Sequence, residues 1–221
     1  MILITRPLAQ TANLKMLLEA SDIEYEFFPT FEVKKIRSEV LKQHYDAIIF
    51  ISVNAVSFAE DYFNKIFTGV HKVFAVGPIT AKRLIDKDIK VDCFPKFNAS
   101  SMELLAMQEC SELIDKRILI VRGKGGSETL KDNLGKFNQV DYLEVYERVP
   151  CEFSSLHAES IKVFLDSTNG VLMAGSNESL SNIVRLLNFD SPDTLNKFKT
   201  RKLIVFSQKI KVLAKSLGFE N

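Results

Sequence analysis

The 221-residue chain has no tryptophan, only three cysteines and three histidines, and almost no net charge. Cys93, Cys110 and Cys151 are odd in number and far apart, which argues against a disulfide framework and against a zinc site. They predict a reducing compartment, so we expect a cytoplasmic protein. Because 29 basic side chains nearly balance 28 acidic ones, non-specific nucleic-acid binding has no electrostatic basis.

Long apolar runs are missing as well. The run at residues 47–51 is among the longest, and it is far below the roughly 20 residues that a membrane-spanning helix requires. The sequence starts directly with the strand-like Ile2-Leu3-Ile4, without the basic region and long apolar run of a signal peptide. We therefore expect no membrane contact. Hydrophobic residues make up 46% of the chain, which predicts a globular protein with an ample core.

The most informative stretch that is present lies at residues 117–130. Its sequence, Arg-Ile-Leu-Ile-Val-Arg-Gly-Lys-Gly-Gly-Ser-Glu-Thr-Leu, predicts a buried strand, a sharp turn at Gly123, Gly125 and Gly126, and a helix start. A strand end followed by a helix N-terminus presents backbone N–H groups to a ligand. Neither G-x-G-x-x-G nor Gly-Lys-Ser/Thr occurs here, so an ordinary β–α turn is favoured over a nucleotide site.

Three strand–helix units occur early in the chain and recur later. The pairs are residues 1–7 with 118–123, 47–56 with 170–179, and 72–81 with 202–210, and helices are predicted at 10–20, 80–86 and 208–217. Strands alternating with helices at this spacing predict parallel sheets with helices on both faces. The repeat predicts two similar domains whose strand ends converge on a shared cleft.

The repeat leaves open which copy of the first unit joins which sheet. Residues 29–35 and 143–150 are extended, alternating and charged, which makes them candidates for paired hinge strands. After the first copy of the third unit, the chain adds residues 92–95 and a further helix near Ser100, whereas nothing comparable follows the second copy. One sheet is therefore expected to be a strand and a helix shorter than the other.

An ordered series of motifs over nearly the full chain resembles the uroporphyrinogen-III synthase family. The motifs are Ile-Thr-Arg6-Pro, Ser52-Val-Asn54-Ala-Val, Val76-Gly77-Pro-Ile-Thr80-Ala, Asn98-Ala-Ser-Ser101-Met-Glu-Leu-Leu, Arg122-Gly-Lys-Gly-Gly, Val145-Tyr146-Glu-Arg148, Ser176-Asn177-Glu-Ser and Ala214-Lys-Ser-Leu-Gly-Phe219. The resemblance implies an α/β fold of two flavodoxin-like parallel-sheet domains, joined by a two-stranded hinge, with the active site in the cleft between them.

The resemblance also implies domain bounds. The terminal domain would hold residues 1–32 and 148–221, the inserted domain residues 33–147, and the hinge strands would lie near 30–36 and 143–150. Two departures from the family stand out. Ser127 occupies a position where members commonly have Arg, so a cation near the turn is missing or supplied by Lys124. The family's last strand and helix have no counterpart in this sequence, so we expect a terminal domain that is shortened at its C-terminus.

The reaction that the resemblance implies is that of a cofactor-independent lyase of haem biosynthesis. Its substrate would be hydroxymethylbilane, a linear tetrapyrrole with eight carboxylates, and its product uroporphyrinogen III. Loss of the terminal hydroxyl gives a cation, a spiro intermediate forms at the last pyrrole, and the macrocycle closes with that ring inverted. No metal or cofactor is implied. We expect a monomer whose partners are this small molecule and, transiently, the preceding enzyme of the pathway.

Tyr146 is the candidate catalytic residue, because its motif matches the family tyrosine thought to assist departure of the hydroxyl. A phenol, with an ordinary pKa near 10, is protonated at neutral pH and can donate to a leaving oxygen. A ring packed in a hinge strand is the alternative. The candidate substrate-binding residues are Arg6, Ser52, Asn54, Gly77, Thr80, Arg122, Gly123, Ser176, Asn177 and Ser207, at strand ends where helix N-termini attract carboxylates.

Plain helix capping is the alternative for each Ser and Asn of this set, and solvated surface is the alternative for each Arg. His44, His71 and His157 are expected at the surface, and Tyr25, Tyr45 and Tyr62 are expected to be structural. The alternative function is a non-catalytic two-domain clamp that binds an anionic small molecule or tetrapyrrole. Two features favour it: Ser127 in place of an Arg, and the expected shortening of the terminal domain. A flavin-binding or response-regulator-like pair is disfavoured, because the strand ends carry Thr, Ser, Gly and Arg rather than an acidic cluster.

Overall fold

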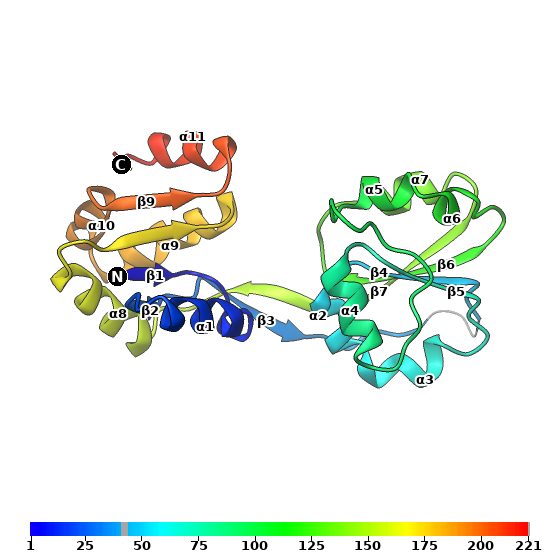
Figure 1. The fold of residues 1–221 in the computed structure, drawn as a ribbon. Helices are drawn as coiled ribbons and strands as arrows, with labels where there is room; N and C mark the ends of the chain where they lie inside the picture. Colours follow the sequence, from blue (N-terminus) through cyan, green and yellow to red (C-terminus); the bar gives the residue numbers. More distant parts are fainter. Residues whose placement is uncertain (41–43, 221) are drawn as a thin grey trace. The chain divides into compact units, whose positions relative to one another are not determined.

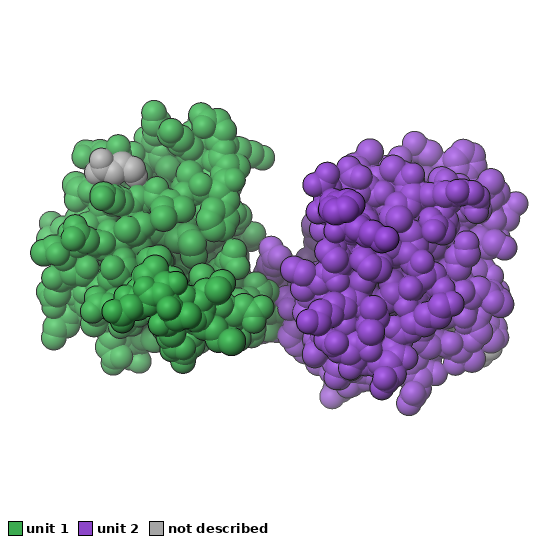
Figure 2. All heavy atoms as spheres, in the orientation of Figure 1, with its two compact units in different colours: residues 1–33, 149–221 green, residues 34–148 purple. Residues whose placement is uncertain are grey.

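A computed structural model describes residues 1–40 and 44–220 and contains two sheets, each accompanied by helices (Figure 1). The chain divides into two compact units, shown in different colours in Figure 2. We call residues 1–33 and 149–221 the terminal unit, and residues 34–148 the inserted unit. The boundaries between the units fall inside β3 (Phe31–Lys35) and inside β7 (Gln139–Pro150), which are neighbours in one sheet.

The terminal unit is built on a parallel sheet with the strand order β2 (Tyr25–Phe27), β1 (Ile2–Ile4), β8 (Val171–Ala174) and β9 (Lys202–Val205). Its helices are η1 (Leu8–Gln10), α1 (Ala12–Ala20), α8 (Ser155–Asp166), α9 (Asn177–Asp190), α10 (Pro192–Lys199) and α11 (Gln208–Ser216). Leu3 and Leu172 of the sheet pack with Phe164, Leu186 and Phe198 of the helices in one buried core. Burial of these side chains holds the strand ends of this unit in place.

The inserted unit has a sheet with the order β3, β7, β6 (Arg117–Gly123), β4 (Ala47–Phe50) and β5 (Lys72–Ala75). The pairs β7–β6, β6–β4 and β4–β5 are parallel. The helices are α2 (Val53–Phe58), η2 (Glu60–Tyr62), α3 (Phe63–Ile66), α4 (Pro78–Ile85), α5 (Ser101–Leu105), α6 (Gln108–Ser111) and α7 (Thr129–Leu134). β4 and β6 are buried on both faces, as expected for continuous β-branched runs.

These sheets confirm the predicted α/β class with parallel strands. In the described part of the chain, the terminal sheet has four strands and the inserted sheet five. The additional strand is not the one expected at residues 92–95, where Cys93 forms only an isolated bridge to Phe74. β1 lies beside β8, whereas β6 lies beside β4, which answers the question that the repeat left open. The hinge and the cleft stay predictions.

Two of the three predicted helices differ from expectation at their first turn. The helix predicted at 10–20 begins at Ala12, because Leu8–Gln10 form a separate 3-10 turn and the Thr11 hydroxyl donates to the Leu8 carbonyl at 2.7 Å. The helix predicted at 80–86 begins at Pro78, since a proline ring presets the backbone angle of a first helical turn. The helix predicted at 208–217 is α11 and ends one residue earlier.

All three cysteines are buried, and among the described residues none is joined to another by a disulfide bond. Burial raises the pKa of the Cys93 thiol to about 11, with a smaller contribution from the Glu109 carboxylate, and burial alone raises that of Cys110 to about 11. Both thiols are therefore protonated at neutral pH. Within residues 1–40 and 44–220, no cluster of His, Cys, Asp and Glu is arranged to hold a metal ion. Over the same residues, no helix is both long and apolar enough to cross a membrane.

His157 corrects a prediction, because it is buried rather than at the surface and is only 2% exposed. Its Nδ1 accepts from the Ser154 backbone N–H at 3.1 Å, which places the ring proton on Nε2, and Nε2 donates to the Pro29 carbonyl at 2.9 Å. The ring also contacts Phe28 edge-on and stacks on Phe153. His157 therefore ties the start of α8 to the segment that precedes β3.

We expect His157→Ala to lower the free energy of unfolding by about 2–4 kcal/mol, because it leaves a cavity and two unpaired backbone groups. Urea denaturation of the purified chain measures this. His71→Ala is the matched control, since His71 is exposed, and surface substitutions change stability by less than about 0.5 kcal/mol. An equally small effect of both substitutions would contradict the role of His157.

Candidate functional site

The carboxyl edge of the inserted sheet brings together turns that are far apart in sequence. β4, β5 and β6 are parallel and adjacent, so the segments that follow them lie along the same edge. Ser52 follows β4 and caps α2, with its Oγ accepting from the Ala55 N–H at 3.1 Å. Gly77 follows β5 and precedes Pro78, the first residue of α4. This edge is our first candidate region.

Tyr146 lies in β7, with its ring against this edge. It is 5% exposed, and its hydroxyl is 3.1 Å from Ser52 Oγ, although the two residues are 94 positions apart. Its ring lies 5.8 Å from the ring of Phe58. A Cβ placed on Gly123 would come within 2.4 Å of the Tyr146 ring, so only glycine leaves room for the phenol here. The structure thus brings three predicted site residues together: Ser52, Gly123 and Tyr146.

Gly77, Thr80 and Asn54 lie nearby in the first turns of α4 and α2. A Cβ on Gly77 would come within 2.4 Å of the Ala99 Cβ, so the glycine allows the segment before α5 to pack against the start of α4. Thr80 is buried and Asn54 is half-buried. The Arg83 side chain of α4 donates to the Ser57 hydroxyl of α2 at 3.1 Å, which links the two helices. This bond links the last turns of the two helices, whose N-termini follow the adjacent strands β4 and β5.

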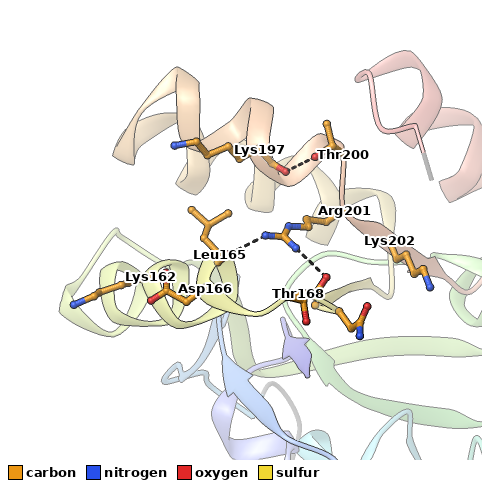
Figure 3. A pocket seen from close by; sticks show the side chains of 10 residues that line it. Lys162, Leu165, Asp166, Thr168, Lys197, Thr200, Arg201 and Lys202 are labelled. Carbon is orange, nitrogen blue, oxygen red and sulfur yellow. Dashed lines mark hydrogen bonds between the residues drawn. The ribbon is translucent and has the colours of Figure 1, made fainter.

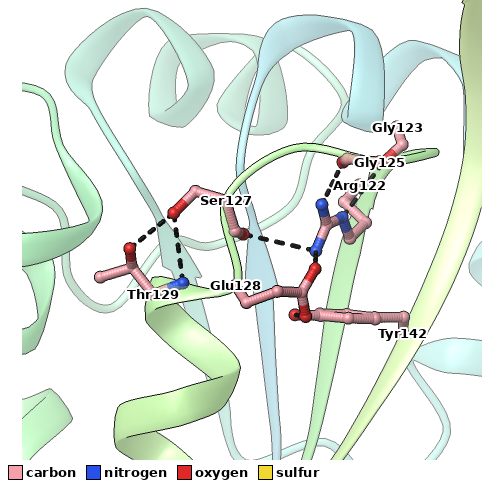
Figure 4. A network of polar contacts seen from close by, with 7 residues as sticks. All are labelled: Arg122, Gly123, Gly125, Ser127, Glu128, Thr129 and Tyr142. Atoms are coloured by element: carbon pink, nitrogen blue, oxygen red, sulfur yellow. Dashed lines mark hydrogen bonds and ion pairs between the residues drawn. The ribbon is translucent and has the colours of Figure 1, made fainter.

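Arg122 does not lie where a substrate-binding cation is expected, because it is buried and only 2% exposed. Its guanidinium donates to the carbonyls of Gly123 and Gly125 and forms an ion pair of 3.0 Å with Glu128 (Figure 4). It also lies 4.4 Å from the centre of the Tyr142 ring. The side chain is thus engaged inside its own turn, and its role in substrate binding stays a prediction.

Ser127, the residue found in place of an Arg, helps to start α7. Its hydroxyl oxygen accepts from the Thr129 N–H at 3.2 Å and lies 2.5 Å from the Thr129 hydroxyl (Figure 4). Lys124, the possible substitute cation, has its ammonium 3.7 Å from the Glu147 carboxylate. That lysine is well exposed and keeps its charge at the surface of the turn.

The carboxyl edge of the terminal sheet carries the remaining predicted residues. Ser176 caps α9 and Ser207 caps α11, each accepting from the N–H three residues later. Arg6 follows β1, is exposed, and has its guanidinium carbon 5.9 Å from the centre of the Phe206 ring. The buried Oδ1 of Asn177 finds no hydrogen-bond partner within the described residues. This edge therefore offers two helix N-termini, an exposed cation and an unsatisfied amide oxygen.

A buried hydroxyl network at the same edge was not predicted. Thr5 Oγ1 donates to the Met173 carbonyl at 2.7 Å, and Thr30 Oγ1 donates to the Thr5 carbonyl at 3.0 Å. The Ser179 hydroxyl lies 3.4 Å from that of Thr5 and 3.2 Å from that of Thr30. The network ties β1, β8 and α9 together. The one signal in the sequence is Thr5 directly before Arg6, where a polar residue ends an apolar strand.

A hollow of about 750 Å³ opens at the opposite, amino edge of the terminal sheet (Figure 3). Its Arg201 donates to the carbonyls of Leu165 and Ser167 at 2.8 and 2.9 Å, and so caps the end of α8. Lys197 pairs with Asp193 at 2.8 Å. Arg201 and Lys197 thus interact with a helix end and a surface carboxylate. Open parallel sheets, moreover, usually bind ligands at their carboxyl edges and not at this one. We therefore take the carboxyl edge of each sheet as a candidate region of its own.

Comparison with known proteins points to one family. The model of the family described as uroporphyrinogen-III synthase HemD matches residues 12–221. The uroporphyrinogen-III synthase of Proteus mirabilis is 28% identical over 114 residues, which cover 50% of this chain and 57% of that relative, less than two thirds of its length. The uroporphyrinogen-III synthase of Escherichia coli strain K12 is 24% identical over 203 residues, which cover 89% of this chain and 80% of the relative.

Solved structures show the same fold. A uroporphyrinogen III synthase from Thermus thermophilus aligns with 99% of this chain and 89% of its own, at 15% identity and a TM-score of 0.56. The uroporphyrinogen-III synthetase from Helicobacter pylori 26695 aligns over 98% of both chains, at 15% identity and a TM-score of 0.55. At this level of identity, the likeness concerns the fold alone.

Proposed function

Because the chain belongs to the uroporphyrinogen-III synthase family, we propose that it cyclises hydroxymethylbilane to uroporphyrinogen III, with loss of water and inversion of the last pyrrole ring. The observation that carries this proposal is the family match over residues 12–221. The pairing of the Tyr146 and Ser52 hydroxyls at the carboxyl edge of the inserted sheet supports it, because departure of a hydroxyl needs a proton donor.

Tyr146 is proposed as the proton donor and Ser52 as its positioning partner. Ser52 Oγ already accepts from the Ala55 N–H, so its own hydroxyl proton can be donated to the Tyr146 oxygen. The phenol proton is then directed to the departing hydroxyl of the bilane, which leaves as water. The proton that the pyrroles lose when the macrocycle closes returns to the phenolate, so the reaction is balanced without a redox step.

Helix N-termini are proposed to bind the carboxylates of the bilane. Those of α4, α9 and α11 lie at carboxyl edges, and each favours an anion by roughly 0.3–1 kcal/mol. Arg6 adds an exposed cation. Within the terminal unit, the N-termini of α9 and α11 together with Arg6 thus attract an anionic molecule although the net charge of the chain is only +1. Folding the bilane for inversion contributes as well, since a thousandfold preference for isomer III needs only about 4 kcal/mol.

The finer points of the assignment are proposals too. We propose a lyase that needs neither metal nor organic cofactor, because the cation forms from the substrate itself when water leaves. We also propose that the chain acts as a cytoplasmic monomer and meets the preceding enzyme of the pathway only transiently.

The test is isomer analysis of the product formed from enzymatically generated hydroxymethylbilane. The proposal predicts isomer III as the main product in proportion to added protein, whereas uncatalysed closure gives isomer I. Isomer I alone at saturating protein would sink the proposal.

A non-catalytic clamp for an anionic tetrapyrrole is the second candidate. The observation that favours it is the engagement of Arg122 inside its turn together with Ser127 in place of an Arg, which leaves fewer cations for a substrate. Calorimetry with uroporphyrinogen III separates the two functions. Product binding without any turnover of the bilane would favour the clamp.

A further inference from the structure

Arg122 holds a turn that ends in direct contact with Tyr146. The guanidinium donates to the carbonyls of Gly123 and Gly125, on both sides of Lys124, and to the Glu128 carboxylate just before α7. Gly125 and Gly126 have positive φ values of 74° and 101°, a region that glycine adopts readily and most other residues avoid. One buried cation therefore fixes the path of the whole turn between β6 and α7.

Tyr142 and Glu128 close a ring of contacts around this guanidinium (Figure 4). The Tyr142 ring lies under Arg122 at 4.4 Å, and its hydroxyl donates to the Glu128 carboxylate at 2.6 Å. The hydrogen bond from Tyr142, and then that from Arg122, lower the pKa of Glu128, while burial and then Glu128 raise the pKa of Tyr142 to about 12. At neutral pH the carboxylate is thus charged and the phenol protonated, as these contacts require.

The turn meets Tyr146 through an irregularity in the sheet. The pairing of β6 with β7 shifts between Arg122 and Gly123, so that Arg122 lies opposite Glu144 and Gly123 opposite Tyr146. Beyond this bulge, the Lys124 N–H donates to the Tyr146 carbonyl at 2.7 Å. The backbone of the turn therefore fixes the position of Tyr146 relative to β6 and also the space beside its ring.

We propose that Arg122 is a positioning residue, which acts through the bulged end of β6 to hold the Tyr146 phenol against Ser52. This inference rests on the proposed function. A positioning role affects the chemical step and not the affinity for substrate. A guanidinium that binds a substrate carboxylate has the opposite effect, since its loss raises KM.

The experiment compares four variants in the coupled bilane assay. Arg122→Met removes the guanidinium, and Arg122→Lys keeps the positive charge but not the planar arrangement of N–H donors. Glu128→Gln and Tyr142→Phe weaken the contacts that the Glu128 carboxylate and the Tyr142 hydroxyl make around the Arg122 guanidinium. Arg117→Met is the control, because Arg117 lies at the other end of the same strand and its side chain is 46% exposed.

For Arg122→Met we expect kcat to fall by about tenfold to a hundredfold, with KM within about twofold and a smaller share of isomer III. Arg122→Lys restores only part of kcat, and Glu128→Gln and Tyr142→Phe each lower it several-fold. Hydrogen exchange of residues 123–129, followed by mass spectrometry, speeds up in the same order. Arg117→Met leaves kcat, KM and exchange unchanged.

A rise of KM with unchanged kcat would overturn the inference and return Arg122 to the substrate-binding set. Unchanged kcat in both Glu128→Gln and Tyr142→Phe would overturn the inference as well. Because the Glu128 side chain is about half exposed, Glu128→Gln tests this without disturbing the fold. If the wild-type chain forms no isomer III, the proposed function fails; if it does and the variants keep kcat, only the inference fails.

Discussion

Tyr146→Phe is expected to lower kcat by a hundredfold or more, while the free energy of unfolding falls by only about 1 kcal/mol. The substitution removes one hydroxyl, which lies 3.1 Å from Ser52 Oγ, and leaves the ring against Phe58 and Gly123 in place. Steady-state kinetics of bilane consumption and urea denaturation measure the two effects separately. Loss of rate with little loss of stability is the signature of a proton donor.

Tyr45→Phe is the matched control for this prediction. Tyr45 is also buried in the inserted unit, at 1% exposure, and its hydroxyl donates to the Asp141 carboxylate at 3.1 Å. We expect a similar loss of stability and an unchanged kcat. Equal kinetic constants for Tyr146→Phe and the wild-type chain would remove Tyr146 from the chemistry and leave it as a packing residue.

Gly123→Ala should be the other damaging change, although it adds only one methyl group. The new Cβ would lie 2.4 Å from Cε2 and 2.5 Å from Cζ of Tyr146, so the ring has to move away. A shift of about 1 Å separates the phenol from Ser52 and is expected to cost about a hundredfold in kcat. The overpacking also costs about 1–3 kcal/mol of stability.

Gly125→Asn serves as the control for the glycine prediction. Gly125 has a φ of 74°, a region that Asn tolerates, and a Cβ there meets no atom within 4 Å among the described residues. We expect kcat within about threefold of wild type. A Gly123→Ala variant with full activity would show that the close contact with Tyr146 has no part in the reaction.

The strand–helix units were predictable because their signals are local. The β-branched run before Gly123 and the Ser residues that cap α2 and α9 are recognised within a few residues of sequence, and the structure places a strand and two helix starts there. The order of the strands in each sheet could not be predicted from such local signals. Which copy of the first unit joins which sheet depends on contacts across more than 100 residues, such as β1 with β8.

The environment of single side chains was not predictable from local pattern. Arg122 at a strand end gives the same local signal whether it faces solvent or folds back, and the deciding partner is Tyr142, 20 positions later in the next strand. His157 stands in a polar stretch, yet its burial is decided by Phe28 and Pro29 far earlier in the chain. In both cases a long-range contact overrides the local composition.

The bulge at Arg122 and Gly123 also had no sequence signal of its own. Glycine was expected there for a sharp turn, and Gly125 and Gly126 have the positive φ values that such a turn needs. Gly123 is required for a different reason, which is the ring of Tyr146 beside it. Tyr146 itself was predicted as the catalytic residue, and its catalytic role stays a prediction.

The most direct test of the central claim is the isomer ratio of the product as a function of protein concentration. Hydroxymethylbilane is generated in the assay, the products are oxidised to porphyrins, and isomers I and III are separated by chromatography. The account predicts a share of isomer III that rises with wild-type protein until it dominates, and a much smaller share for Tyr146→Phe at the same concentration. Isomer I as the sole product at every concentration of the folded wild-type chain would contradict it.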